Sequence, residues 1–131
     1  MAYRLLDTNI VSYIVNNHTP AAAYLPHLAG YDWAVSFQTW AELVYGGALA
    51  GWGDARWAAL DAMLARLTVL HSDETVCEEW AAIRVARRSQ PMPVADCWFA
   101  ATALAFGLEV VTHNPADFRG IPGLVVVTEA P

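Results

Sequence analysis

The sequence predicts an α/β domain in which helices cover both faces of a parallel sheet. Short apolar strand patterns alternate with longer helical patterns, which is the order of elements expected for a parallel sheet. The runs at 110–111 and 125–127 are consecutive valines, as expected for strands buried on both faces. At 131 residues and 56% apolar composition, the chain has the length and core material of one domain. We therefore expect residues 1–131 to form a single three-layer α/β/α domain.

This alternation places five strands and six helices along the chain. Asp73 is a suitable N-cap, Pro93 suits the first turn of the last helix, and Gly107 suits that helix's C-terminal cap. We expect a parallel sheet in the order 3-2-1-4-5, in which the first and fourth strands are neighbours. The expected strands are 3–6, 33–37, 68–71, 109–112 and 124–128, and the expected helices are 8–17, 20–29, 39–50, 53–67, 73–88 and 94–106.

The charge of the chain restricts its function. The net charge is −6, and all seven basic residues are arginine. Phosphate contacts come from basic side chains, so an acidic chain is poorly suited to coating RNA or DNA nonspecifically. Enzymes that transfer phosphoryl groups through an aspartyl phosphate normally need a lysine, and this sequence has none. A metal-dependent nuclease is compatible with the charge, because bound divalent cations offset carboxylates locally.

We expect the protein to act in the cytoplasm. Asp7 interrupts the N-terminal apolar stretch, so no secretory signal is evident. Polar residues and prolines within 8–31 are incompatible with a membrane span. Cys77 and Cys97 suit a reducing compartment, show no metal-binding spacing and are expected to be buried.

Four acidic residues, Asp7, Glu42, Asp96 and Asp117, are expected at one edge of the sheet. Asp7 follows the first strand and Asp117 lies in the loop after the fourth, whereas Glu42 and Asp96 belong to the first turns of two helices. Right-handed crossovers place strand-to-helix connections at the same edge, where ligands bind at the point of strand-order reversal. Carboxylates without cationic partners repel one another, and divalent cations relieve that repulsion. The four acids therefore predict a metal-dependent phosphodiester-cleaving enzyme.

Each acid taken singly also has a structural interpretation. Asp7 could cap the following helix, Asp96 could favour its helix dipole, and Asp117 could be a turn residue. Glu42 could lie on a solvated helix face. A purely structural fold has no reason to gather four acids at one edge, so their combination favours a functional site.

The segments around these acids resemble the motifs of PIN-domain ribonucleases, in particular the VapC toxins of bacterial type II toxin–antitoxin pairs. The resemblance covers essentially the whole chain. At 97–99, Cys-Trp-Phe stands where the family more often has smaller or aliphatic residues, which bears on helix packing and partner fit. The matching motifs are Leu-Leu-Asp-Thr-Asn at 5–9, Ala-Glu-Leu at 41–43, Asp96 followed by Ala-Ala-Thr-Ala at 100–103, and Thr-x-Asn-x-x-Asp-Phe at 112–118.

This resemblance implies a Mg²⁺- or Mn²⁺-dependent endoribonuclease that is the toxin of a toxin–antitoxin pair. A metal-activated water would cleave the phosphodiester bond. The implied partners are a cognate antitoxin and RNA, with transfer or ribosomal RNA loops as the expected target class, and a homodimer or a hetero-oligomer with the antitoxin. The alternative is a catalytically silent PIN-like scaffold that only binds a partner. The implied catalytic residues are Asp7, Glu42, Asp96 and Asp117, the metal ligands Asp7, Asp96 and Asp117, and the supporting polar residues Thr8, Thr112 and Asn114.

Two tryptophans are candidates for antitoxin binding. Trp52 and Trp57 lie beside glycines at a helix–helix junction, where exposed aromatic residues often mark a protein interface. We expect an apolar antitoxin helix to lie across 39–67 near these residues, at a distance from the acidic site.

Other residues have two interpretations. Arg84, Arg87 and Arg88 share one helical face and are either solvated helix-end residues or contacts for the RNA backbone. His113 lies within the last motif, but a neutral imidazole is not a preferred Mg²⁺ ligand. We therefore expect the acids, and not His113, to hold the metal.

Overall fold

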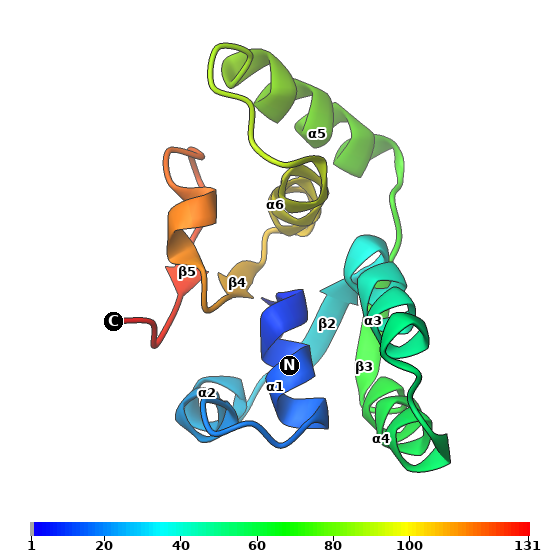
Figure 1. The fold of residues 1–131 in the computed structure, drawn as a ribbon. Helices are drawn as coiled ribbons and strands as arrows, with labels where there is room; N and C mark the ends of the chain where they lie inside the picture. Colours follow the sequence, from blue (N-terminus) through cyan, green and yellow to red (C-terminus); the bar gives the residue numbers. More distant parts are fainter. Residues whose placement is uncertain (1) are drawn as a thin grey trace.

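The computed structural model describes residues 2–131 and contains a five-stranded parallel sheet (Figure 1). The strand order is β3-β2-β1-β4-β5, which confirms the predicted order. All four strand pairs are parallel. The strands are β1 (Tyr3–Leu6), β2 (Asp32–Ser36), β3 (Leu67–Leu70), β4 (Glu109–Val111) and β5 (Val126–Val127).

Helices cover both faces of this sheet and complete the predicted three-layer α/β/α architecture (Figure 1). One group packs on the first face: α1 (Thr8–Val15), α2 (Ala21–Leu28), α3 (Phe37–Ala50) and α4 (Asp54–Leu64). The opposite face carries α5 (Glu74–Ala86) and α6 (Val94–Phe106). Along the chain, β4 and then the 3₁₀ helix η1 (Pro115–Phe118) follow α6.

Adjacent residues of the central strands contribute to different hydrophobic cores. Leu5 and Val110 pack in the core that contains Phe99 of α6. Leu6 and Val111 pack in the core on the other face. Successive strand residues point to opposite faces, so a sheet covered on both sides needs consecutive apolar residues. This requirement explains the run Val110–Val111. The run at 125–127 is not fully buried, contrary to expectation, because β5 is an edge strand: Val125 is exposed, and Val126 and Val127 are only partly buried.

Capping residues set where α3 begins and where α6 ends. Ser36 accepts a hydrogen bond from the Thr39 backbone N at 3.2 Å, so α3 starts two residues earlier than the expected range of 39–50. Glu42 therefore lies in the second turn and not in the first. Gly107 has φ of 66° at the C-terminal end of α6, which confirms its predicted role.

Several local predictions differ from the structure. Asp73 does cap α5, through a 2.9 Å bond from the Val76 N–H, but Pro93 is the N-cap residue of α6 and not part of its first turn. The last strand is shorter than 124–128, because only Val126–Val127 pairs with β4. Cys97 is buried as expected, whereas Cys77 is exposed.

The helices of residues 2–131 are all too short or too polar to cross a membrane.

Candidate active site

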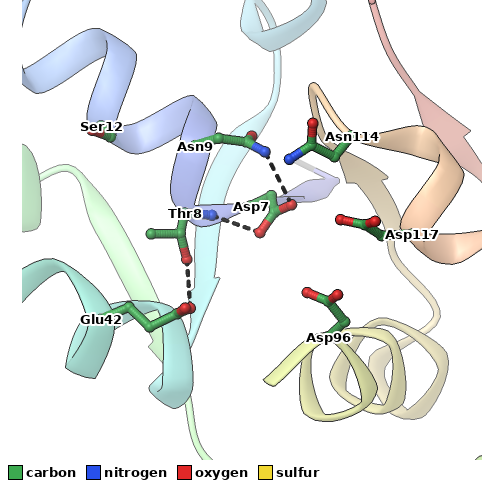
Figure 2. Close-up of a pocket in the computed structure, with 8 residues that line it drawn as sticks. All are labelled: Asp7, Thr8, Asn9, Ser12, Glu42, Asp96, Asn114 and Asp117. Carbon is green, nitrogen blue, oxygen red and sulfur yellow. Dashed lines mark hydrogen bonds between the residues drawn. The ribbon is translucent and has the colours of Figure 1, made fainter. Parts of the chain in front are cut away.

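The four predicted acids surround one pocket of about 350 Å³ at the carboxyl edge of the sheet (Figure 2). Asp7 comes from the junction of β1 and α1, Glu42 from α3, Asp96 from the first turn of α6, and Asp117 from η1. The pocket is also lined by Thr8, Asn9, Ser12 and Asn114.

Asp7 has both a structural role and a place in the pocket. Its Oδ1 accepts a 2.8 Å hydrogen bond from the Thr8 backbone N, which caps α1. Its Oδ2 accepts a 2.8 Å bond from the Thr112 hydroxyl and a longer bond, 3.4 Å, from the Asn9 amide. The carboxylate is therefore held in a fixed orientation toward the pocket.

The buried hydroxyl of Thr112 links the two strands that flank the site. It donates to Asp7 and accepts a 3.0 Å bond from the backbone N of Asn114. Because Asn114 begins the segment that leads to Asp117, this bond orders the chain on the β4 side of the pocket. Thr112 therefore contacts Asp7 directly, and its supporting role in catalysis stays a prediction.

Glu42 is exposed but oriented by its neighbours. The Thr8 hydroxyl donates to its Oε1 at 2.8 Å (Figure 2). The amide of Gln38, one turn earlier on α3, donates to the same oxygen. Gln38 was not predicted from the sequence, although its spacing of four residues from Glu42 is the signal that would have identified it.

The electrostatics of the pocket disfavour ionised carboxylates. Burial is the main cause that raises the pKa of Asp96 to about 6, and the negative charges of Asp117, Asp7 and Glu42 add to it. Burial also raises the pKa of Asp7, partly opposed by the hydrogen bonds from Thr112 and Thr8. None of the described residues lining the pocket is basic. The negative charge is therefore uncompensated by protein groups.

The side chains of this pocket suit a hard divalent cation. Carboxylates, two amides and hydroxyls present oxygen donors, which Mg²⁺ and Mn²⁺ prefer. Across residues 2–131, no three His, Cys, Asp or Glu side chains are already arranged to share one ion. Mg²⁺ usually keeps several waters and uses only one or two carboxylates together with substrate phosphate. The donor set fits a hydrated ion of this kind.

Neutralising Asp96 should stabilise the metal-free protein. In the folded protein the pKa of Asp96 is about 6, above the ordinary value of 3.8. Its favourable contribution to the stability of the fold is therefore present below pH 3.8 and is lost as pH rises through 6. Asp96→Asn removes that penalty. After allowance for partial exposure, we expect a gain of about 1 kcal/mol at pH 7.5, or roughly 3–5 °C in Tm. The gain should disappear below pH 4.

Asp54 offers a matched control for this measurement. It occupies the first turn of α4, as Asp96 does of α6, but it is exposed and lies outside the pocket. Asp54→Asn should leave Tm unchanged or lower it slightly, because an acid there favours the helix dipole. A drop in Tm for Asp96→Asn at pH 7.5 in EDTA would instead identify Asp96 as a structural cap.

The two tryptophans are less exposed than predicted. Trp52 and Trp57 are half-buried against the second core and pack edge to face, with ring centroids 5.2 Å apart. Both rings approach Gly47, whose missing side chain leaves room for them. Trp52 is also nearer the site than expected, because it lines a groove together with Thr8 and Glu42. Antitoxin binding by these residues stays a prediction.

Arg84 at the end of α5, and Arg87 and Arg88 directly after it, lie outside the pocket and contact backbone carbonyls. Arg87 Nη1 donates to the Arg119 carbonyl at 3.0 Å, and Arg88 Nη1 donates to the Val85 carbonyl at 2.8 Å. Arg84 Nη1 makes a longer contact, 3.4 Å, with a carbonyl of the α5–α6 connection. These contacts favour the helix-end interpretation.

His113 is held beside the pocket and does not line it. Its Nδ1 lies 2.5 Å from the Tyr24 hydroxyl. Its ring contacts those of Tyr13 and Tyr24 edge to face, with centroids 5.5 and 5.6 Å away. Its backbone N donates to the Asn9 side chain at 3.3 Å, which makes Asn9 a bridge between this loop and Asp7. The sequence did not single out Asn9, although it belongs to the first motif.

Comparison with known proteins assigns the chain to a family. A family model described as the PIN domain matches residues 4–124. The chain belongs to the PIN-domain family. Ribonuclease VapC1 of Haemophilus influenzae is 31% identical over 124 residues, with 92% of both chains covered. Within the PIN-domain family, this chain is therefore a member of the VapC group.

Two further comparisons agree with this assignment. The tRNA(fMet)-specific endonuclease VapC of Shigella flexneri is 28% identical over 122 residues, with 92% of both chains covered. A solved structure of VapBC2 from Rickettsia felis was determined bound to a DNA fragment from the VapBC2 promoter. Its matching chain has a TM-score of 0.85 to this protein at 27% identity. That comparison covers 98% of both chains.

Proposed function

We propose that this protein is a Mg²⁺- or Mn²⁺-dependent endoribonuclease and the toxin of a toxin–antitoxin pair, acting in the cytoplasm. The observation that carries the proposal is the pocket of four acids with no basic residue among its described lining side chains. The similarity of the whole chain to proteins named VapC ribonucleases supports RNA as the substrate. The VapBC complexes among its structural neighbours support an antitoxin as the partner.

We assign different roles in hydrolysis to the acidic side chains of the pocket. A divalent ion, when bound, would supply a water of lowered pKa and would stabilise charge on the scissile phosphate. Asp7, fixed by Thr8 and Thr112, together with Asp96 and Asp117, would hold that ion. Glu42 would complete the ion's surroundings or orient the attacking water. No side-chain nucleophile is required.

The substrate class and the assembly are inferred from the relatives. One relative is named as specific for tRNA(fMet), which favours a loop of transfer RNA over ribosomal RNA as the target. Single-stranded loops present unstacked bases that a protein can read. A cognate antitoxin would restrain cleavage in a hetero-oligomer, and an arginine or lysine directed at the acids would compete with the metal.

Removal of divalent ions should eliminate RNA cleavage. With EDTA, the carboxylates lose the cation that activates water, so cleavage of a transfer RNA transcript should fall to background. Excess Mg²⁺ or Mn²⁺ should restore it and yield 5′-phosphate and 3′-hydroxyl ends. Calorimetric titration of Mg²⁺ into the protein provides a readout independent of activity, with Asp96→Asn expected to bind more weakly. Undiminished cleavage in EDTA, or no cleavage with either metal, would contradict the proposal, and the latter result would favour a silent scaffold.

A further inference from the structure

A second hollow extends from the acidic pocket along α3. It has a volume of about 340 Å³ and shares Thr8, Ser12 and Glu42 with the pocket. Figure 2 shows these three residues on the side of the pocket formed by α1 and α3, opposite Asp96 and Asp117. We call this hollow the Trp52 groove. Its remaining lining residues are Leu43, Gly46, Gly47, Ala50 and Trp52.

The Trp52 groove exists because α3 carries small residues along it. Gly46 lies four positions before Ala50 on α3, and Gly47 lies three positions before it, so these residues line one side of the helix. The rings of Trp52 and Trp57 cover Gly47, whereas a Cβ added at Gly46 would meet no atom within 4 Å, so a flat group can approach the helix backbone at Gly46. Trp52 adds an aromatic ring, and Thr8 and Ser12 add hydroxyls.

We propose that the Trp52 groove seats the base of a nucleotide next to the scissile phosphate, with Trp52 as its stacking partner. This proposal rests on the proposed ribonuclease function. An endonuclease must hold RNA on both sides of the bond that it cleaves, and this hollow is continuous with the acidic pocket. Proteins bind unpaired bases by stacking on aromatic rings and by hydrogen bonds to base edges.

Charge decides which part of the nucleotide enters the groove. Glu42 is the one charged residue among the described lining side chains, and it stands at the junction with the acidic pocket. A phosphate would be repelled by this carboxylate, whereas a neutral base would not. The hydroxyls of Thr8 and Ser12 can donate to or accept from a base edge. The groove therefore suits a base, with the ribose–phosphate backbone outside it.

The test compares Trp52 with Trp57, which packs on the same glycine but does not line the groove. Trp52→Leu removes the aromatic face, Trp52→Phe retains one, and Trp57→Leu disturbs the same packing from the other side. Cleavage of a randomised single-stranded RNA pool with Mg²⁺ is followed by mapping of the cut ends. Loss of stacking should raise KM roughly 5- to 150-fold, with little change in kcat.

The base preference at the cut ends gives the second readout. Trp52→Leu should lose the preference on one side of the cut, whereas Trp52→Phe and Trp57→Leu should keep it. Gly46→Leu covers the case in which Trp52→Leu does not fold. An added Cβ at Gly46 meets no atom within 4 Å, so the new side chain begins in open space and is expected to occupy the groove. It should also raise KM and lose the preference.

Equilibrium binding separates this proposal from the proposed function. Fluorescently labelled RNA from the same pool is titrated into Asp96→Asn protein, with and without Trp52→Leu. Weaker RNA binding caused by Trp52→Leu supports the base site even if neither the wild-type protein nor any variant cleaves RNA. Equal KM, base preference and RNA binding for the Trp52→Leu and Trp57→Leu proteins would overturn it. Loss of antitoxin capture with unchanged RNA binding would likewise overturn it and assign the groove to the protein partner.

Discussion

Asp7→Asn should abolish RNA cleavage and leave the fold intact. Asn caps a helix as well as Asp does, so the bond from the Thr8 backbone N that begins α1 can persist. The amide carries no charge and is a weaker partner for a divalent ion. We expect cleavage to fall by roughly 10²–10³-fold or more, as when a group that stabilises the transition state is removed. Cleavage of a transfer RNA transcript at saturating Mg²⁺ measures the loss.

Asp7→Ala distinguishes the two roles of this carboxylate. Alanine loses both the charge and the cap, so it should lose cleavage and be about 1 kcal/mol less stable than the Asn protein, which keeps the cap. Thermal unfolding should therefore separate the Ala protein from the Asn protein, while both are inactive. An Asn protein that cleaves at the wild-type rate would show that Asp7 is only a helix cap.

Gly47→Ala should destabilise the protein, whereas Gly46→Ala should stabilise it. A Cβ at Gly47 would lie 2.6 Å from Trp52 Cε3 and 2.7 Å from Trp57 Cη2, so both rings would have to move. Overpacking of this kind costs about 1–3 kcal/mol. A Cβ at Gly46 meets nothing within 4 Å, and alanine is favoured over glycine within a helix by about 0.5–1 kcal/mol.

The two glycine variants control for each other, because the same substitution is made at adjacent positions of α3. Thermal unfolding of both proteins should give Tm values roughly 6–15 °C apart. Equal Tm values would show that the tryptophans adjust without cost. A further substitution, Trp57→Phe in the Gly47→Ala protein, should recover part of the loss by shortening the ring that the new methyl group meets.

The sheet and the acids were predictable because they depend on patterns within short segments. The consecutive valines at 110–111 identified a buried strand, and the right-handed connection rule then placed Asp7 and Asp117 at one edge. Residues that depend on distant contacts were not predictable in this way. The exposure of Trp52 and Trp57 was misjudged because their shared contact with Gly47 forms only when α3 and α4 pack.

Local ambiguity explains the remaining differences. Phe37 continues the strand pattern of 33–37, and only the Ser36 cap shows that the helix has already begun there. Because α3 begins two residues earlier than expected, Glu42 lies in its second turn, but it still lines the pocket. Gln38 lies outside the expected helix of 39–50, so its helical spacing from Glu42 was not recognised from the sequence.

The pairing of β1 with β4 has a consequence for how the active molecule comes into being. The Thr112–Asp7 bond joins residues 105 positions apart, so the pocket is closed by a contact between segments that are distant in the sequence. Such long-range contacts carry a large entropic cost and form slowly in folding. A fragment that ends before Glu109 contains Asp7, Glu42 and Asp96 but lacks β4, Thr112 and Asp117. During synthesis, the pocket therefore cannot assemble until β4 and Asp117 have been made.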